Sequence, residues 1–261
     1  MKRMSHLLLG LTCLLVALWL VAPTLVIVPM SFGEKKSLAF PPSGFSLKWY
    51  ENFFSNPSWF GSFTTSLKIG LIVAVVATAL GTAAAIGIEK MKNRVGGIIR
   101  AILITPMIVP GVVLAIGIYA VYLDQRLVGT YVGYVLAHTM LAIPFVLIAV
   151  SANLAVFDER LETAAGSLGG SPFVTFRTIS LPLIAPGILS GMLFAFVTSF
   201  DEIIVSLFIN SPSLKTLPVQ IFSSMTRDAD PTVTAVGTLI FFATTLTIGL
   251  GLLVGTRTRR R

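Results

Sequence analysis

Six apolar segments divide this chain, and each is long enough to cross a lipid bilayer as a helix. A helix needs roughly 20 apolar residues to span the hydrocarbon core. The segments cover residues 7–30, 63–88, 98–122, 132–152, 185–209 and 233–255. Charged residues make up only 11% of the 261 residues, against about 25% in soluble proteins. The sequence therefore predicts an all-α, polytopic membrane helix bundle with six transmembrane helices, in one transmembrane domain over residues 1–261.

The distribution of Lys and Arg predicts how the segments are oriented. Seven basic residues fall in the connections predicted to lie outside, and twelve fall at the termini or near the inner connections: Lys2, Arg3, Lys90, Lys92, Arg94, Arg100, Arg160, Arg177, Arg257, Arg259, Arg260 and Arg261. By the positive-inside rule, both termini and the loop at residues 157–182 are cytoplasmic. The net charge of +8 thus reflects membrane anchoring, and no nucleic-acid role is predicted. The first segment exceeds the 7–15 apolar residues of a signal peptide, so we expect a retained helix.

The loop at residues 157–182 contains the most specific pattern, which reads LETAAGSLGGSPFVTFRTISLP from Leu161. Leu161, Ala165 and Leu168 fall at i, i+4 and i+7, the spacing of one helix face. Ala164 and Ala165 are small, so a partner surface can approach closely. The alternative is an ordinary amphipathic connector between two spans.

The second half of this loop predicts a turn and another short helix. Gly169 and Gly170 can end the first helix, because glycine accepts a positive φ. Ser171 followed by Pro172 suits the N-cap and first turn of a second helix. The loop is therefore predicted to be a helix–turn–helix that leads back to the membrane at Pro182.

Together these positions resemble the cytoplasmic EAA loop of bacterial ABC importer permeases, which has two alanines, a glycine and then I-x-L-P. The matching and neighbouring residues that the resemblance assigns to ATPase coupling are Glu162, Ala164, Ala165, Gly169, Ile179, Leu181 and Pro182. The family has Glu directly before the alanines, where this chain has Thr163, and Glu162 stands one residue earlier. One residue turns a helical side chain by about 100°, so the pairing of Glu162 with an ATPase stays open.

The resemblance extends to residues 51–85 and 199–225, and the second of these stretches resembles the spermidine/putrescine-type subfamily. It implies a type I ABC importer permease in the bacterial inner membrane, forming half of a translocation path. It also implies three partners: an ABC ATPase dimer, a second and different permease subunit, and a periplasmic solute-binding protein. The implied solute is a polyamine such as putrescine or spermidine. Another small organic solute, such as an amino-acid derivative or an organophosphonate, is the alternative.

The motifs that are missing from the sequence argue against an enzyme. The chain has no G-x-x-x-x-G-K-[ST] phosphate loop, so ATP and Mg²⁺ are expected on the partner ATPase. Two histidines and one cysteine leave little scope for a metal site, and neither a cofactor nor a metal is predicted. A membrane-embedded enzyme and a secondary transporter remain the rival classes.

Asp201 and Glu202 are acidic residues within the fifth apolar segment, and they are the candidate solute contacts. A charged residue at the centre of a membrane helix costs about 2.5–3.5 kcal/mol, so both should face protein or water. They form either an acidic station for a cationic solute or a structural hydrogen-bonding pair. His138 is expected to be a buried, hydrogen-bonded residue rather than a proton relay. Pro106 and Pro110 are expected to kink the third segment.

Overall fold

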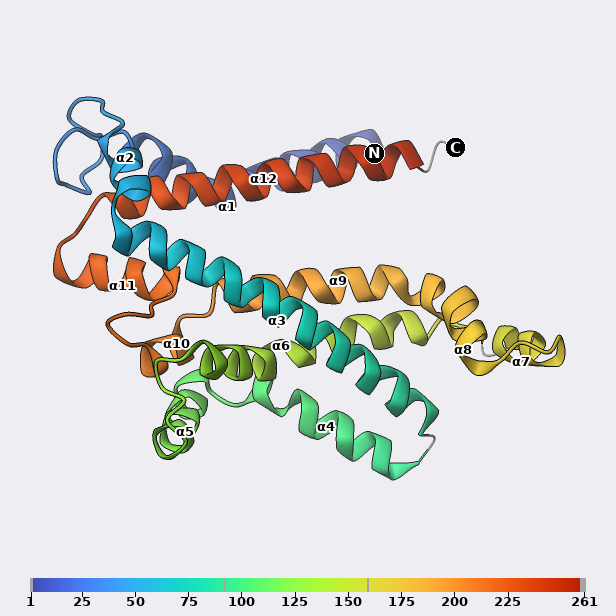
Figure 1. Ribbon diagram of the computed structural model, residues 1–261. Coiled ribbons are helices and arrows are strands. Elements are labelled where there is room, and N and C mark those ends of the chain that lie inside the picture. Colours follow the sequence, from blue (N-terminus) through green and yellow to red (C-terminus); the bar gives the residue numbers. More distant parts are fainter. Residues whose placement is uncertain (1, 92, 159, 259–261) are drawn as a thin grey trace. The chain divides into compact units, whose positions relative to one another are not determined.

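The structure of the chain, a computed structural model, describes residues 2–91, 93–158 and 160–258 (Figure 1). These residues form helices joined by turns, with an isolated bridge between Ser211 and Leu214. They group into two compact units: residues 1–60 with 221–261, and residues 61–220. Some residues that are predicted to be cytoplasmic lie outside the described ones: Lys92, Glu159 and residues 259–261.

Four helical runs are long and apolar enough to cross a membrane. They are α1 (Lys2–Met30), α3 (Pro57–Lys90), α6 (Tyr131–Leu154) and the run Pro172–Phe200, which contains α8 (Pro172–Thr175), a π turn η1 (Phe176–Ser180) and α9 (Leu181–Phe200). The last predicted segment lies in α12 (Thr232–Thr258), whose shorter apolar part covers Thr232–Thr247. The all-helical membrane class is therefore confirmed, and the count of six crossings stays a prediction.

The third predicted segment is a broken helix. α4 (Arg94–Ile108) and α5 (Gly111–Asp124) meet at an angle of 103°. Between them, Val109 has extended backbone with ψ 133°, as the residue before a proline prefers, and Pro110 has no N–H to continue the α4 ladder. The expected kink is thus a complete break, with Pro110 as its physical cause.

The first unit joins α1, α2 (Lys48–Ser55) and α12 through the connection after α1. The indole nitrogen of Trp59 donates to Asp230 at 3.1 Å, and the amide of Asn52 donates to the Thr232 hydroxyl at 2.7 Å. The indole of Trp49 donates to the Gly33 carbonyl at 2.7 Å. Some aromatic side chains in the segment 31–61 therefore make contacts within the protein. Others, such as Phe54, are exposed.

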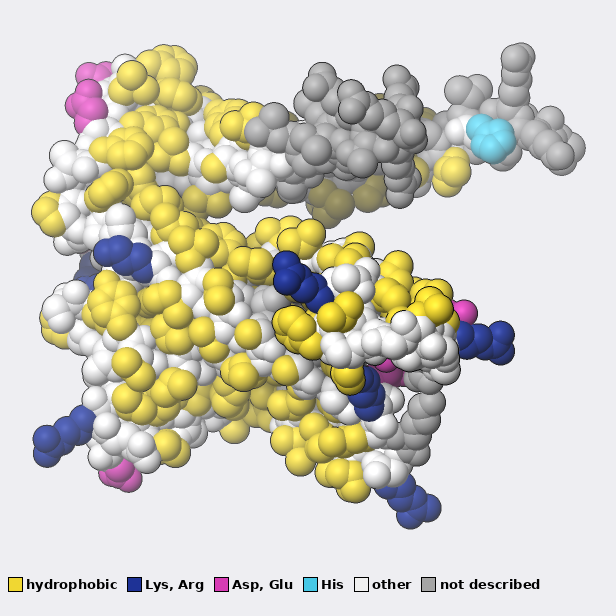
Figure 2. Space-filling model, turned by 45° about the vertical axis from the view of Figure 1, so that its right-hand side comes forward, with side chains coloured by type: hydrophobic (Ala, Val, Ile, Leu, Met, Phe, Trp, Pro, Cys, Tyr) yellow, Lys and Arg dark blue, Asp and Glu magenta, His cyan; other side chains and the backbone are white. Residues whose placement is uncertain are grey.

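The second unit is built on the packing of α6 against α9. The buried face of α9 carries small side chains at every fourth position: Gly187, Gly191, Ala195 and Ser199. This spacing keeps them on one side of the helix and lets the two backbones approach closely, as is common between membrane helices. Outward-facing side chains are largely hydrophobic, as Figure 2 shows for one face of the molecule, which suits contact with lipid.

α3 reaches the same contact from another side of α6. A Cβ atom placed on Gly81 of α3 would lie 2.7 Å from Cβ of Val146, and one on Gly191 of α9 would lie 3.1 Å from Cα of Val146. Val146 is fully buried in α6. A larger residue at either glycine would collide with α6, so both positions require glycine. Val146 therefore lies where α3, α6 and α9 meet.

We expect Gly81→Ala to destabilise the protein by about 1–3 kcal/mol, because the added methyl group overlaps Val146 in a closely packed core. The control is Gly117→Ala in α5, where an added Cβ meets nothing within 4 Å. That variant should be neutral or slightly stabilising, since alanine favours helix over glycine. Thermal unfolding of the purified protein in detergent measures both effects, and equal midpoints for the two variants would contradict the close approach of α3 and α6.

Candidate functional site

Two groups of candidate residues lie at opposite ends of α9. The loop at residues 157–182 leads into its first residue, and Asp201 follows its last residue (Figure 1). At the same end as Asp201, a short helix, α10 (Ile204–Ile209), packs against α5 and α6. One helix therefore connects the two groups. Its 20 residues, at a rise of 1.5 Å each, make it roughly 30 Å long.

The loop folds as the helix–turn–helix that the sequence predicts. Its first helix is α7 (Arg160–Ser167), and Gly169 follows with φ +85°, a conformation that glycine adopts at little cost. The N–H of Gly170 donates to the carbonyl of Ala165 at 3.0 Å. Ser171 then caps α8, since its hydroxyl accepts from the N–H of Val174 at 3.4 Å.

A π turn connects this loop to α9. The N–H of Leu181 donates to the carbonyl of Phe176, five residues earlier. The next residue, Pro182, has no N–H, and its ring would crowd the carbonyl of Thr178 in a regular α-helix. The wider turn relieves that conflict. The Ile179-x-Leu181-Pro182 motif thus marks the place where the loop turns into the membrane span.

The exposure of side chains in α7, and of Leu168 directly after it, corrects one detail of the predicted helix face. Leu168 is 90% exposed and Leu161 43%, and Ala164 is exposed with them. Ala165 was expected on this outer face but is half-buried instead, because the Gly170 turn folds back onto its carbonyl. Phe173, which the sequence analysis did not single out, is 71% exposed in α8. The loop therefore exposes large apolar side chains: Leu161 and Leu168 before the apolar run Pro172–Phe200, and Phe173 at its start.

Glu162 faces the inside of the loop. Its Oε1 accepts a hydrogen bond from the hydroxyl of Ser180 at 2.5 Å, and Ser180 is buried. Thr163, which stands where the family pattern has its acid, is exposed. Glu162 and Ser180 line a cavity of about 600 Å³, together with residues from the last turns of α3 and α6. The acid of the loop is thus engaged within the chain.

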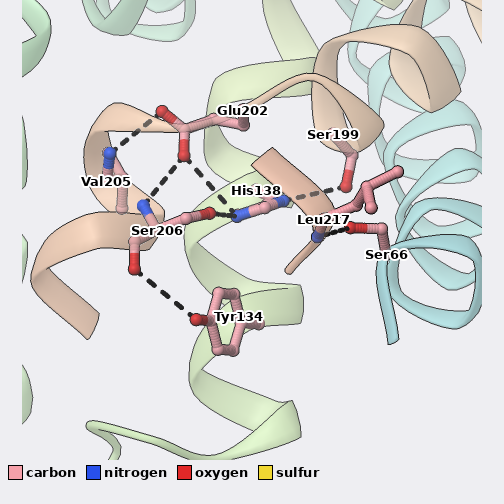
Figure 3. Close-up of polar contacts among 8 residues, drawn as sticks. All are labelled: Ser66, Tyr134, His138, Ser199, Glu202, Val205, Ser206 and Leu217. Atoms are coloured by element: carbon pink, nitrogen blue, oxygen red, sulfur yellow. Dashed lines mark hydrogen bonds and ion pairs between the residues drawn. The ribbon is translucent and has the colours of Figure 1, made fainter. Parts of the chain in front are cut away.

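At the other end of α9, Asp201 and Glu202 lie at a break between two helices. The sequence analysis wrongly expected one continuous helix there. α9 ends at Phe200 and α10 begins at Ile204. Glu202 accepts hydrogen bonds from the N–H groups of Val205 and Ser206, both at 2.9 Å (Figure 3). Its carboxylate therefore caps the free N–H groups at the start of α10.

His138 anchors this break to α6. Its Nδ1 lies 2.9 Å from the Ser199 hydroxyl, its Nε2 lies 3.1 Å from the Ser206 hydroxyl, and the same Nε2 lies 3.8 Å from Glu202 (Figure 3). The His138 side chain is completely buried. The prediction of a buried histidine bonded across helices is confirmed.

The two acids therefore differ in their surroundings. Glu202 is half-buried and has backbone partners, whereas Asp201 is exposed. Among the described residues, no side chain bonds to or pairs with the Asp201 carboxylate. Phe200, directly before it, packs edge-on against Phe63 and stacks on Phe196. The arrangement leaves Asp201 as the carboxylate available to a ligand, with aromatic rings on the preceding turn.

Comparison with known proteins gives a consistent result. Residues 77–260 match the family described as "Binding-protein-dependent transport system inner membrane component". The spermidine/putrescine transport system permease protein PotC of Haemophilus influenzae is 31% identical over 225 residues, covering 85% of this chain and 86% of PotC. The putrescine transport system permease protein PotI of Escherichia coli (strain K12) is 31% identical over 252 residues, covering 92% and 86%.

A solved structure supports the fold. A chain of a bacterial ABC transporter involved in the import of the acidic polysaccharide alginate superposes with a TM-score of 0.68 at 14% identity, covering 98% of this chain and 96% of that one. The family match extends over most of the sequence and includes the loop and the break at both ends of α9. This chain belongs to the binding-protein-dependent transport system inner membrane component family, the permease components of ABC importers.

Proposed function

We propose that this chain forms half of the membrane path of an importer for a polyamine such as putrescine or spermidine, with Asp201 as a contact for the cationic solute. The observation that carries the solute class is an exposed, unpaired carboxylate at a break in an apolar span. An acid at membrane depth is costly, and an ammonium group offsets that cost strongly where the dielectric constant is low. The names of PotC and PotI agree with this solute class.

As a member of its family, the chain is an integral inner-membrane protein and a transport component rather than an enzyme, and the family works with an ATPase and a binding protein. The finer arrangement is part of the proposal. ATP and Mg²⁺ bind to an ABC ATPase dimer, and a second, different permease subunit completes the path. A periplasmic binding protein delivers the solute, and both termini of this chain face the cytoplasm.

The ATPase docks, in this proposal, on the outer face of the loop at residues 157–182. Leu168 and Phe173 support this role, because both are large, apolar and mostly exposed in a polar loop. Ala164 lies on the same exposed face of α7 and leaves room for a partner. Burying such a surface in a groove removes apolar area from water, which favours association.

The orientation is testable by cysteine labelling in intact cells. Cys13, which is exposed in α1, is first replaced by serine. Cysteines at Ser43 and Ser213, both exposed, should react with a membrane-impermeant reagent from outside, and a cysteine at Ser167 should react only after the cells are opened. External labelling at Ser167 would reverse the orientation and remove the loop from the ATPase side.

The docking role predicts opposite results for the same added charge at two positions of the loop. Leu168→Glu should abolish copurification of the ATPase, because a carboxylate buried at a contact without a partner costs several kcal/mol. Thr163→Glu adds the same charge to the same loop, at the position where the family has its acid, and should leave copurification intact. Full copurification with Leu168→Glu would mean that the ATPase binds elsewhere.

The solute role predicts that the two neighbouring acids respond differently. Asp201→Asn should reduce putrescine or spermidine uptake about tenfold at limiting solute, which corresponds to about 1.4 kcal/mol, with unchanged thermal stability. Glu202→Gln should lower the unfolding temperature, since it weakens the cap on α10. Radiolabelled uptake at matched membrane levels measures the first effect. Normal uptake by Asp201→Asn, or no amine uptake by the wild type, would end the polyamine assignment while the permease role remained.

A further inference from the structure

The inward-facing acid of α7 suggests a function inside the loop. In the family pattern the acid stands directly before the two alanines, a position that here is the exposed Thr163. Glu162 is turned by about 100° from that position and points to Ser180. Its carboxylate is therefore directed at the base of α9 rather than at the exposed face of α7.

The hydrogen bond joins two elements that are far apart in the sequence. Glu162 lies in α7, and Ser180 is the last residue of the π turn, directly before α9. Their side chains meet at 2.5 Å over a separation of 18 residues. The hydroxyls of Ser167 and Thr178, by contrast, bond to carbonyl groups four residues back in their own segments. The Glu162–Ser180 contact is thus a tertiary link between helix α7 and the span.

Apolar packing contributes little to holding α7 in place. All eight residues of α7 are described, and none of them is buried. A cavity of about 600 Å³ lies beside the helix and is lined by Glu162, Thr163 and Gly166. A charge-assisted hydrogen bond is about twice as strong as a neutral one, and it gains strength where water is partly excluded. The Glu162–Ser180 bond therefore gives α7 a strong polar attachment to the base of α9, beside its packing against α8 and η1.

We propose that Glu162 is a positioning residue that clamps α7 to the base of α9 through Ser180, so that movement of the docked ATPase is transmitted to the span that ends at Asp201. This inference rests on the proposed docking role of the loop. Without the clamp, α7 follows the ATPase while α9 stays behind, because the cavity leaves room for the helix to tilt. ATP hydrolysis then continues, and fewer solute molecules cross for each ATP consumed.

The test uses the complete transporter, reconstituted with its ATPase and binding protein. Glu162→Ala and Ser180→Ala should each lower putrescine uptake per ATP hydrolysed about tenfold, the effect of losing one charge-assisted hydrogen bond. ATPase copurification and basal ATP hydrolysis should remain at wild-type levels, since Leu168 and Phe173 are unchanged. The double variant should be no worse than either single variant, because both remove the same bond.

Three further variants separate the clamp from general damage. Ser180→Thr keeps the hydroxyl, and the adjacent cavity has room for its methyl group, so it should retain the wild-type ratio. Glu162→Gln keeps an acceptor without the charge and should give an intermediate ratio. Ser167→Ala removes a hydroxyl from the same helix and should have no effect, since that hydroxyl bonds within α7.

Two results would overturn the clamp. One is a wild-type ratio of uptake to ATP hydrolysis in Glu162→Ala. The other is loss of ATPase copurification in Glu162→Ala, because it would mean that the carboxylate binds the ATPase directly. Failure of the docking role itself shows in a different variant, as normal copurification with Leu168→Glu, and so the two proposals are tested separately.

Discussion

Backbone N–H groups freed by a helix break within a membrane must be bonded inside the protein, because lipid offers them no partner. At the start of α10, one side chain meets this constraint. Glu202 accepts from the N–H groups of Val205 and Ser206, and His138 connects Ser199 and Ser206 on both sides of the break. This buried network allows the fifth apolar segment to be interrupted and to expose Asp201 there. The proposed solute contact at Asp201 therefore depends on a neighbouring acid whose carboxylate is bonded within the protein.

The close packing of α6 and α9 connects this network to the rest of the second unit. The small residues from Gly187 to Ser199 hold α9 against α6 along its length, and Ser199 is also the partner of His138. In the proposed coupling, this packing passes a movement at the base of α9 along the helix, since packed interiors transmit strain. The same stripe of small residues thus packs α9 against α6 and ends at the Ser199 hydroxyl that bonds to His138.

Local features were readable from the sequence. Gly169, Ser171 and Pro172 predicted the turn and the second helix of the loop, because capping and positive φ depend on residue type within a few positions. The apolar segments likewise predicted the membrane class. The angle between α4 and α5 was not predictable, because Pro110 dictates that the helix breaks but tertiary packing decides how far it bends. The break at Asp201 was hidden for a similar reason: the side chain that bridges it is His138, which lies more than 60 residues earlier and bonds to Ser199 and Ser206 on either side of the break.

The helix face of α7 shows why a motif alone leaves the role of its acid open. Leu161 pairs with Ala164 or with Ala165 at equally good helical spacings, so periodicity could not say which alanine faces outward. The structure decides through a non-local bond, because the Glu162–Ser180 contact turns one side of α7 toward the base of α9 and leaves Leu161, Ala164 and Leu168 outside. A one-residue shift of the acid relative to the family pattern therefore moves it from the exposed face to the inner one. The loop keeps an exposed apolar surface, on which we propose that the ATPase docks, and its carboxylate bonds to the base of the chain's own membrane span.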